Sequence, residues 1–329
     1  MRSESVRGLI LGLVLVAGCK PEPHRPDAAP PWWKPVPGEA ADWDIQLAAS
    51  PFDVSAQRAM YTLDLWDVVP TATTIDYSDG MPPLAVPAGA HASAIADLHT
   101  RTPPAIVVCQ IGVGSIRLTD PDAKKFPIYE ASPPNRQTAP AAGSVIGWST
   151  TTADANERFI DIHQAARTII TPLIKKRIDL AQTIGCDAIA AKDSDVPAFQ
   201  DPGGIGHGFP DISFSEYESW TGVVAGYAHS LRISVGPHNR STLAVDQMAV
   251  THDWIIAERC AEFQECDMYQ PFLNRSKAVF ALEYNKNEAG MDNNPTTLCG
   301  RLETARIQDG IIKDAALSSA VYVPCSAQP

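Results

Sequence analysis

The strongest constraint on the fold of this chain is an alternation of short apolar runs with longer amphipathic segments. The runs have the length of buried β-strands, and the segments between them have the length of helices. This alternation is typical of βα units repeated around a parallel sheet. We predict eight strands, at residues 59–65, 105–110, 159–163, 186–190, 232–236, 253–258, 278–284 and 320–325.

The segments between the runs carry helical signals. Ser215 and Glu218 have the spacing of a capping box, and apolar residues recur at helical spacing from Trp220 to Leu231. Eight strands within residues 40–329 match the strand number and size of a (β/α)8 TIM barrel, a single α/β domain. A doubly wound open sheet is the alternative, but no glycine fingerprint for a dinucleotide follows the first strand.

The first residues have the pattern of an export signal. Arg2 and Arg7 precede an apolar run at residues 9–17 that is too short to span a bilayer. The run ends in small residues followed by Cys19, which resembles the site where bacterial lipoproteins are cleaved and acylated. We therefore predict a lipoprotein signal peptide at 1–18 and lipidation of Cys19. The alternative is an ordinary signal peptide with an incidental cysteine, so the expected location is the bacterial cell envelope, as an outer-membrane lipoprotein or a secreted protein.

Residues 19–39 are rich in proline, which predicts an extended tether before a barrel at 40–329. Within the tether, Trp32 and Trp33 are expected to pack against the folded domain.

The charge balance excludes one class of partner. The 329 residues carry 26 basic and 38 acidic side chains, a formal net charge of −12. Such a chain has no electrostatic footprint for a nucleic-acid backbone. We expect a monomer that contacts the membrane only through its lipid anchor.

Polar residues at the ends of the predicted strands are the candidate functional residues, because barrel enzymes place their sites at the carboxyl ends of the strands. Carboxylates dominate this set, which comprises Asp64, Asp67, Gln110, Asp161, His163, Asp193, Asp195, His238, Asn239, Glu258 and Glu283. Any one of them has a structural alternative as a helix cap, a solvated loop residue or a salt-bridge partner. Several carboxylates at one edge favour glycoside hydrolysis, which needs one carboxylic acid and one carboxylate and no cofactor.

Other chemistries have weaker support. The histidines and cysteines show no spacing typical of a zinc site, so we predict no metal. The glycine-rich stretch at 203–208 lacks the lysine of a phosphate-binding loop, and no Gly-x-Ser-x-Gly elbow indicates a serine hydrolase.

Ten fragments in register give the chain a resemblance to glycoside hydrolase family 114, the endo-α-1,4-polygalactosaminidase barrels. They are Trp43 with Gln-Leu at 46–47, YTLDLWD at 61–67, IADLH at 95–99, CQIGVGS at 109–115, PDAKKFP at 121–127, ERFIDI at 157–162, IGCDAI at 184–189, GFP at 208–210, AERCAEFQEC at 257–266 and KAVFALEYN at 277–285. The resemblance implies a hydrolase of galactosamine-rich polysaccharide that acts through carboxylates on the fourth and sixth strands.

Carried over to this sequence, the acid on the sixth strand is Glu258. On the fourth strand, an alignment without a gap puts Lys192 in the place of the family's aspartate, whereas a shift of one residue puts Asp193 there; we adopt the shift. The substrate-binding residues that we predict are Asp64, Asp161, Asp195, His238, Asn239 and Glu283.

Several positions depart from the family pattern where function would lie, including Ile116, Arg117, Thr119 and Asp120. The resemblance as a whole implies a glycosidase that cleaves α-linked galactosamine- or galactose-containing polysaccharide. Because of these departures, a catalytically inactive barrel that binds glycan is an alternative. A purely structural envelope lipoprotein is another.

Six cysteines remain once Cys19 is assigned to lipid, an even number that agrees with export to an oxidising compartment. We predict two disulfides, Cys260–Cys266 and Cys299–Cys325. Cys109 and Cys186 lie on predicted strands, where buried thiols are the expectation.

Overall fold

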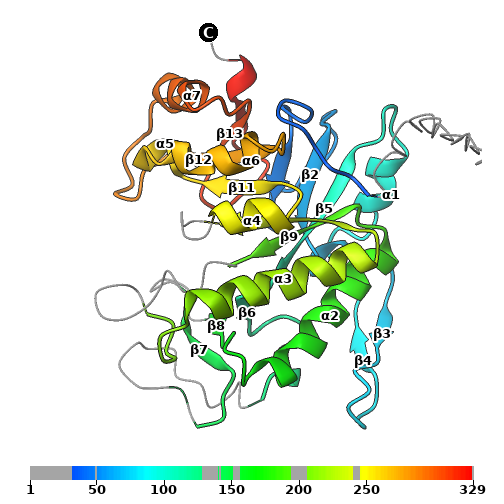
Figure 1. Cartoon of the computed structure of the whole chain (residues 1–329). Helices are drawn as coiled ribbons and strands as arrows, with labels where there is room; N and C mark the ends of the chain where they lie inside the picture. The colour runs from blue at the N-terminus through cyan, green and yellow to red at the C-terminus, as the bar shows by residue number, and fades with distance from the viewer. Residues whose placement is uncertain are drawn as a thin grey trace, which may run out of the picture. The chain divides into compact units, whose positions relative to one another are not determined.

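Eight parallel strands form one curled sheet in a computed structural model of the chain (Figure 1). The structure describes residues 32–48, 50–127, 140, 142–150, 156–193, 206–239 and 245–327, and Trp32–Pro329 form one compact unit. The parallel strands, in sheet order, are β1 (Asp44–Gln46), β2 (Met60–Asp64), β5 (Ile106–Gly112), β9 (Ala188–Lys192), β10 (Ser234–Asn239), β11 (Ile255–Glu258), β12 (Val279–Tyr284) and β13 (Asp309–Lys313). A short strand, β14 (Val323–Pro324), pairs antiparallel with β13.

The predicted α/β class and the number of strands agree with the structure, but two of the eight predicted strands were wrong. The run at 159–163 overlaps β8 (Glu157–Ile160), which belongs to an antiparallel sheet with β6 (Ser115–Arg117) and β7 (Ile146–Ser149). The run at 320–325 contains only β14. Their places are taken by β1, which has three residues, and β13, which begins and ends with a charged residue. Neither has a long apolar run.

The first and last parallel strands meet through side chains. Lys313 Nζ on β13 lies 2.6 Å from Asp44 Oδ1 on β1. Trp43 donates its indole N–H to the carbonyl of Asp309 at 2.9 Å. The sheet is therefore curled far enough for its two ends to make contact.

Helices cover the outer face of the sheet and fill most of the connections between strands (Figure 1). They are α1 (Ala94–His99), α2 (Arg167–Ile184), α3 (Phe214–Ser230), α4 (Val245–Thr251), α5 (Cys260–Phe263), α6 (Gln270–Leu273) and α7 (Pro295–Thr304). The 3-10 turns are η1 (Trp66–Val68), η2 (Ala123–Lys125), η5 (Cys266–Tyr269) and η6 (Cys325–Ala327), and β3 (Thr73–Ile75) pairs with β4 (Leu84–Val86) as a hairpin. No helix within the described ranges has the length and apolar character needed to cross a membrane.

The capping box of α3 lies two residues before the predicted one. Ser213 is the N-cap, and its hydroxyl accepts from the backbone N–H of Glu216 while the Glu216 carboxylate accepts from the backbone N–H of Ser213. Ser215 and Glu218 lie inside the helix. Serine and glutamate recur at the same spacing in both pairs, so the spacing alone does not distinguish them.

Two apolar cores lie on opposite faces of the sheet. The outer core joins residues such as Val107 and Ile189 to the helices, for example to Ile170 and Trp220. The inner core contains the alternate strand positions, which are Ile45, Met60, Val108, Ala188, Ala190, Ile256, Phe280, Leu282 and Ile311. Because successive side chains of a strand point to opposite faces, the position within each strand decides which residues face inward.

The segment from Trp32 packs against the sheet at the amino ends of its strands. The Trp33 ring lies 5.9 Å from that of Trp254 and 6.1 Å from that of Phe280. Trp32 stacks on His229 at 4.5 Å and donates its indole N–H to Asp253 Oδ1 at 3.1 Å. Both tryptophans thus pack against the folded unit, as predicted, although they lie in the segment that was predicted to be a tether.

Three disulfides are present in the part of the chain that the structure describes. Cys260–Cys266 and Cys299–Cys325 confirm the predicted pairs. The expectation of free thiols at Cys109 and Cys186 was wrong, because these residues form the third bridge. They are separated by 77 positions in sequence, but β5 and β9 are neighbours in the sheet, which brings the two residues together.

Candidate functional site

The inward-facing positions of the strands become polar at their carboxyl ends. Residues two or four positions apart on a strand point to the same face. On β2, Asp64 lies four residues after the inward-facing Met60. Two residues separate Gln110 from Val108 on β5, and Lys192 from Ala190 on β9. The same step of two leads from Ile256 to Glu258 and from Leu282 to Tyr284. The inner core therefore ends in a layer of polar side chains, where parallel α/β proteins bind their ligands.

A cavity of about 130 Å³ opens at this layer. It is lined by Leu47, Gln110, Thr150, Glu157, Phe159, Lys192, Asp193, His238, Glu258, Tyr284 and Leu317. A second cavity, of about 100 Å³, shares Leu47, Gln110, Glu157 and Lys192 with the first and extends to Asp64, Arg117, Asp120 and Arg177. The two residues predicted to be catalytic, Asp193 and Glu258, thus line the same cavity.

Glu258 is the last residue of β11, and two neighbouring strands orient it. Tyr284 on β12 donates its hydroxyl to Glu258 Oε1 at 2.8 Å. On the other side, His238 Nε2 on β10 lies 3.3 Å from Glu258 Oε2, although the two atoms are not aligned for a hydrogen bond. His238 is held by its other ring nitrogen, Nδ1, which lies 3.0 Å from Gln110 Oε1. The carboxylate is thus fixed at the wall of the cavity.

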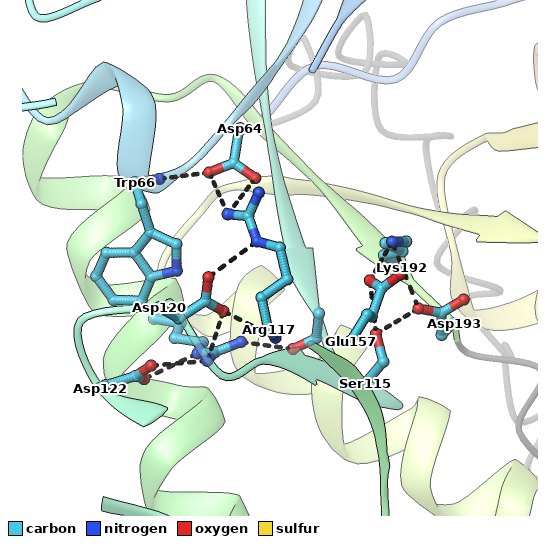
Figure 2. Close-up of polar contacts among 11 residues, drawn as sticks. Asp64, Trp66, Ser115, Arg117, Asp120, Asp122, Glu157, Lys192 and Asp193 are labelled. Carbon is cyan, nitrogen blue, oxygen red and sulfur yellow. Dashed lines mark hydrogen bonds and ion pairs between the residues drawn. The ribbon is translucent and has the colours of Figure 1, made fainter. Parts of the chain in front are cut away.

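Asp193 follows directly after β9 and has a left-handed backbone with φ of 53°. It is buried, and Ser115 on β6 donates a short hydrogen bond to its Oδ2 (Figure 2). Lys192 Nζ lies 3.9 Å from the same oxygen. The left-handed turn brings Lys192 and Asp193, two consecutive residues, to the same cavity.

Glu157 is a third carboxylate at the cavity, and sequence reasoning missed it. It comes from β8, and its Oε1 forms a close ion pair with Lys192 Nζ (Figure 2). Thr150 donates to its other oxygen at 3.1 Å. Burial opposes the ionisation of Glu157, but the Lys192 ammonium, the Thr150 hydrogen bond and the Arg117 charge together hold the pKa of Glu157 below its ordinary value.

Lys192 itself is the central cation of the cavity. Burial disfavours its charge, but the surrounding carboxylates, with Asp193 and Glu157 contributing most, outweigh burial and raise the pKa of Lys192 above its ordinary value. The ammonium is therefore retained at neutral pH, in contact with the second cavity as well as the first.

Asp64 lies at the second cavity, where it already has a cationic partner. Arg117 on β6 approaches Asp64 at 2.8 Å and Asp120 at 3.0 Å (Figure 2). The fully buried Arg177 on α2 then joins Asp120 at 3.2 Å to Asp122 at 2.7 Å. These five residues form an ion-pair network, buried except at the partly exposed Arg117, that fixes the antiparallel sheet against the end of β2.

The structure places three more of the predicted substrate-binding residues, and only two of them lie at the edge of the sheet that carries the cavity. His238 lines the cavity, and Asn239 ends β10 in register with Ala257, which places it at the same edge of the sheet. Asp161 is not in either cavity lining and instead pairs with His163 Nδ1 at 2.5 Å. Asp195 lies outside the described residues.

Glu283 does not face the cavity, contrary to the prediction. Its side chain is fully buried on the outer face of β12 and accepts from the backbone N–H of Ala261 at 2.7 Å and of Glu262 at 3.2 Å. Burial raises its pKa to about 7. A carboxylate oxygen of Glu283 also lies within 4.8 Å of both sulfurs of Cys260 and Cys266, but the disulfide between them removes the thiolates that would bind a metal.

Alternation of side chains along β12 distinguishes the residues that face the cavity from those that face the helices. Phe280 and Leu282 face the inner core, so Tyr284 faces the cavity and Glu283 faces the helices. The same alternation selects Gln110 on β5 and Lys192 on β9. Glu157 carries no such signal, because it reaches the cavity from a separate sheet.

The arrangement provides two carboxylates with different surroundings. Glu258 is next to a phenol and an imidazole, whereas Asp193 is next to an ammonium and a hydroxyl. A pair of carboxyl groups with unequal environments is the general requirement for acid/base cleavage of a glycosidic bond.

Comparison with known proteins agrees with this chemistry. The model of glycoside-hydrolase family GH114 matches residues 22–328. Among solved structures, Ega3 from Aspergillus fumigatus in complex with galactosamine is similar, with a TM-score of 0.64 and 22% identity over 89% of this chain and 97% of that chain. The glycoside hydrolase domain of PelA from Pseudomonas aeruginosa has a TM-score of 0.52 and 11% identity over 87% of this chain and 98% of that domain. Comparison with curated protein sequences found no match.

Proposed function

The chain belongs to glycoside hydrolase family GH114, and from this premise we propose that it is an exported glycosidase acting on α-linked galactosamine- or galactose-containing polysaccharide. The observation that carries the proposal is the convergence of Asp193 and Glu258 on one cavity at the carboxyl ends of the strands. The complex of the similar protein Ega3 with galactosamine supports this class of substrate.

Glu258 is proposed as the general acid/base. Its carboxyl group would protonate the glycosidic oxygen as the bond to the anomeric carbon breaks. The hydrogen bond from Tyr284 holds Glu258 in place, and His238 borders its other oxygen at 3.3 Å, so the carboxyl group has a defined direction for proton transfer.

Asp193 is proposed as the nucleophile or base. The Lys192 ammonium at 3.9 Å and the Ser115 hydroxyl stabilise negative charge on its carboxylate, which must be ionised to attack the anomeric carbon or to activate water. The anomeric configuration of the first product, read by proton NMR, distinguishes these two roles, since a nucleophile retains the configuration and a base inverts it.

The proposed scaffold is a (β/α)8 barrel, closed between β13 and β1. The contacts of Lys313 with Asp44 and of Trp43 with Asp309 support closure, as does the predicted family resemblance. We also propose that the protein is a lipoprotein of the bacterial cell envelope, because three disulfides agree with an oxidising compartment. Loss of palmitate labelling in a Cys19→Ala variant would test the anchor.

A catalytically inactive, glycan-binding barrel is the second candidate. The observation that favours it is Lys192, which ends β9 at an inward-facing position and neutralises part of the acidic cavity. Under this alternative, the ion pairs of Lys192 with Glu157 and of Arg117 with Asp64 would serve binding without turnover.

Hydrolysis of partly deacetylated α-1,4-galactosaminan tests both candidates. We expect the wild-type protein to release reducing ends, and Glu258→Gln and Asp193→Asn to lower kcat by about 100-fold or more without loss of fold. Glu303→Gln, an exposed position on α7, is the matched control and should retain full activity. Binding by an unmutated protein that releases no product would establish the inactive barrel. Full activity in both carboxylate variants would refute the assigned roles.

A further inference from the structure

The Tyr284 phenol, which donates its hydroxyl to Glu258, has a cation on the face of its ring. The guanidinium carbon of Arg259 lies 4.3 Å from the ring centroid. A cation at this distance is attracted by the aromatic face, and more strongly where water is excluded. The Arg259 side chain is only 12% exposed, so the contact is largely shielded from solvent.

The backbone at Arg259 departs from the strand that precedes it. Arg259 follows the last residue of β11 and has a left-handed backbone with φ of 60°. In a strand that continued unchanged, its side chain would point to the face opposite Glu258. The turn instead leaves the guanidinium over Tyr284 on the neighbouring strand β12. Such a backbone is unfavourable for an arginine, so the contacts of the side chain must compensate for it.

Glu262 fixes the guanidinium of Arg259. Its Oε2 pairs with Arg259 Nη1 at 2.6 Å. The segment after β12 holds Glu262 in turn, since the backbone N–H of Glu288 donates to Oε1 at 3.1 Å. Asn293 donates to the backbone carbonyl of Tyr284 at 3.0 Å, which ties the same segment to the residue that carries the phenol.

A cation held on the ring acts on Glu258 through the phenol. It withdraws electron density from the ring, which makes the hydroxyl a stronger donor to the carboxylate. A stronger donor and a nearby positive charge both favour the ionised form of a carboxyl group. Glu262 limits this effect, because it neutralises part of the Arg259 charge.

From this geometry we propose that Arg259 is a positioning residue, which acts on Glu258 through the Tyr284 phenol, and that Glu262 sets how much of its charge the phenol experiences. The inference rests on the proposed function, in which Glu258 is the acid/base. Arg259 is not in the lining of either cavity at the site, so it would act without touching a substrate there.

Other titratable groups face Glu258 or Arg259 from the neighbouring elements. They are His238 on β10, Lys192 on β9, Asp193 after β9, Glu157 on β8 and Glu283 on the outer face of β12. None of them is replaced in the test, so the difference between a variant and the wild-type protein reports the charge that was changed.

The pKa of Glu258 in the free protein tests the inference, because its measurement needs no turnover. Carbon-13 NMR of labelled glutamate carboxyl groups gives this pKa, with the Glu258 signal identified by its loss in Glu258→Gln. We expect Arg259→Met to raise the pKa of Glu258 by about 0.5 or more, since the carboxylate loses a stabilising charge. Glu262→Gln should lower it, because the guanidinium loses its counter-ion while glutamine still accepts a hydrogen bond.

Two controls separate positioning from structural damage. Arg259→Lys keeps a cation over the ring and should retain the wild-type pKa of Glu258. Arg275→Met removes an arginine charge from an exposed position before β12 and should leave that pKa unchanged. In a Tyr284→Phe background, Arg259→Met should have a smaller effect, because the phenol transmits it.

Shifts of the Glu258 pKa in the same direction in Arg259→Met and Glu262→Gln, or equal effects of Arg259→Met with and without the phenol, would overturn the inference alone. In a protein that hydrolyses galactosaminan, the basic limb of the pH–rate profile should move with the pKa in both variants. The expected pKa shifts in a protein that releases no product would overturn the proposed function alone.

Discussion

Glu283 makes the stability of this fold depend on pH in a direction that can be worked out. Its carboxyl group is fully buried, and its pKa of about 7 is raised from an ordinary value of 4.5. A raised folded-state pKa means that the folded protein binds this proton more tightly than the unfolded chain does. The stabilisation from the protonated form is complete below pH 4.5 and is lost as pH rises through 7.

The size of the effect follows from the difference between the two pKa values. One pKa unit corresponds to about 1.4 kcal/mol, so the contribution of Glu283 changes by about 3 kcal/mol across this interval. The two backbone N–H donors at Ala261 and Glu262 partly compensate for the burial of the charge, and their effect is already contained in the net pKa.

The assay is urea unfolding of wild-type and Glu283→Gln protein at several pH values from 4.5 to 8, with the disulfides intact. Glutamine does not titrate, so any lost hydrogen bond changes the free energy of unfolding by an amount independent of pH. We expect the wild-type protein to lose about 3 kcal/mol relative to the variant as pH rises. Glu303→Gln, at an exposed position of α7, should follow the wild-type curve. Parallel curves for wild type and Glu283→Gln would refute the reasoning.

Three further outcomes are expected. Tyr284→Phe removes the 2.8 Å hydrogen bond to Glu258 and should lower kcat of an active protein by about tenfold. The free energy of unfolding should change little. An unchanged pH–rate profile would count against this positioning role. Replacing both Cys109 and Cys186 by alanine opens a 77-residue loop and should lower the free energy of unfolding, measured in urea, by about 4 kcal/mol. Peptide mapping of the wild-type protein without reductant would show that the two cysteines are bonded to each other. Arg177→Met leaves the buried Asp122 without its cation and Asp120 with Arg117 alone, and it should cost about 3–5 kcal/mol in urea unfolding. A loss below about 1 kcal/mol would show that the network is solvated.

The agreement between sequence and structure was best where the signal is local. Six of the predicted strands overlap members of the parallel sheet, because each is an apolar run long enough to be buried on both faces. The sequence does not reveal β1 and β13, since a strand of three residues or one with charged ends carries little apolar signal. Lys313 and Asp44 nonetheless lie buried together, because each satisfies the charge of the other.

The place of the candidate site, at the carboxyl ends of the strands, was predictable, but its members were predictable only in part. Glu258 is the last residue of β11 and His238 the last but one of β10, and both line the cavity, as expected for residues near the carboxyl ends of strands. Glu283 was assigned to the wrong face because every position of β12 is buried, so the sequence does not show which residues face inward until the inner core is known. Glu157 could not be found at all, because no local pattern links β8 to the end of β9.

What the sequence determined by itself is the α/β class, the presence of carboxylates at the strand ends and membership of the GH114 family, since short-range periodicity and motif order express all three. Only the tertiary structure decided which carboxylates share a cavity, that Lys192 stands between Glu157 and Asp193, and that Cys109 bonds Cys186. The physical reason is that these contacts depend on sheet order and on the face to which each side chain points. A change of one residue along a strand reverses that face, and no composition or spacing records it.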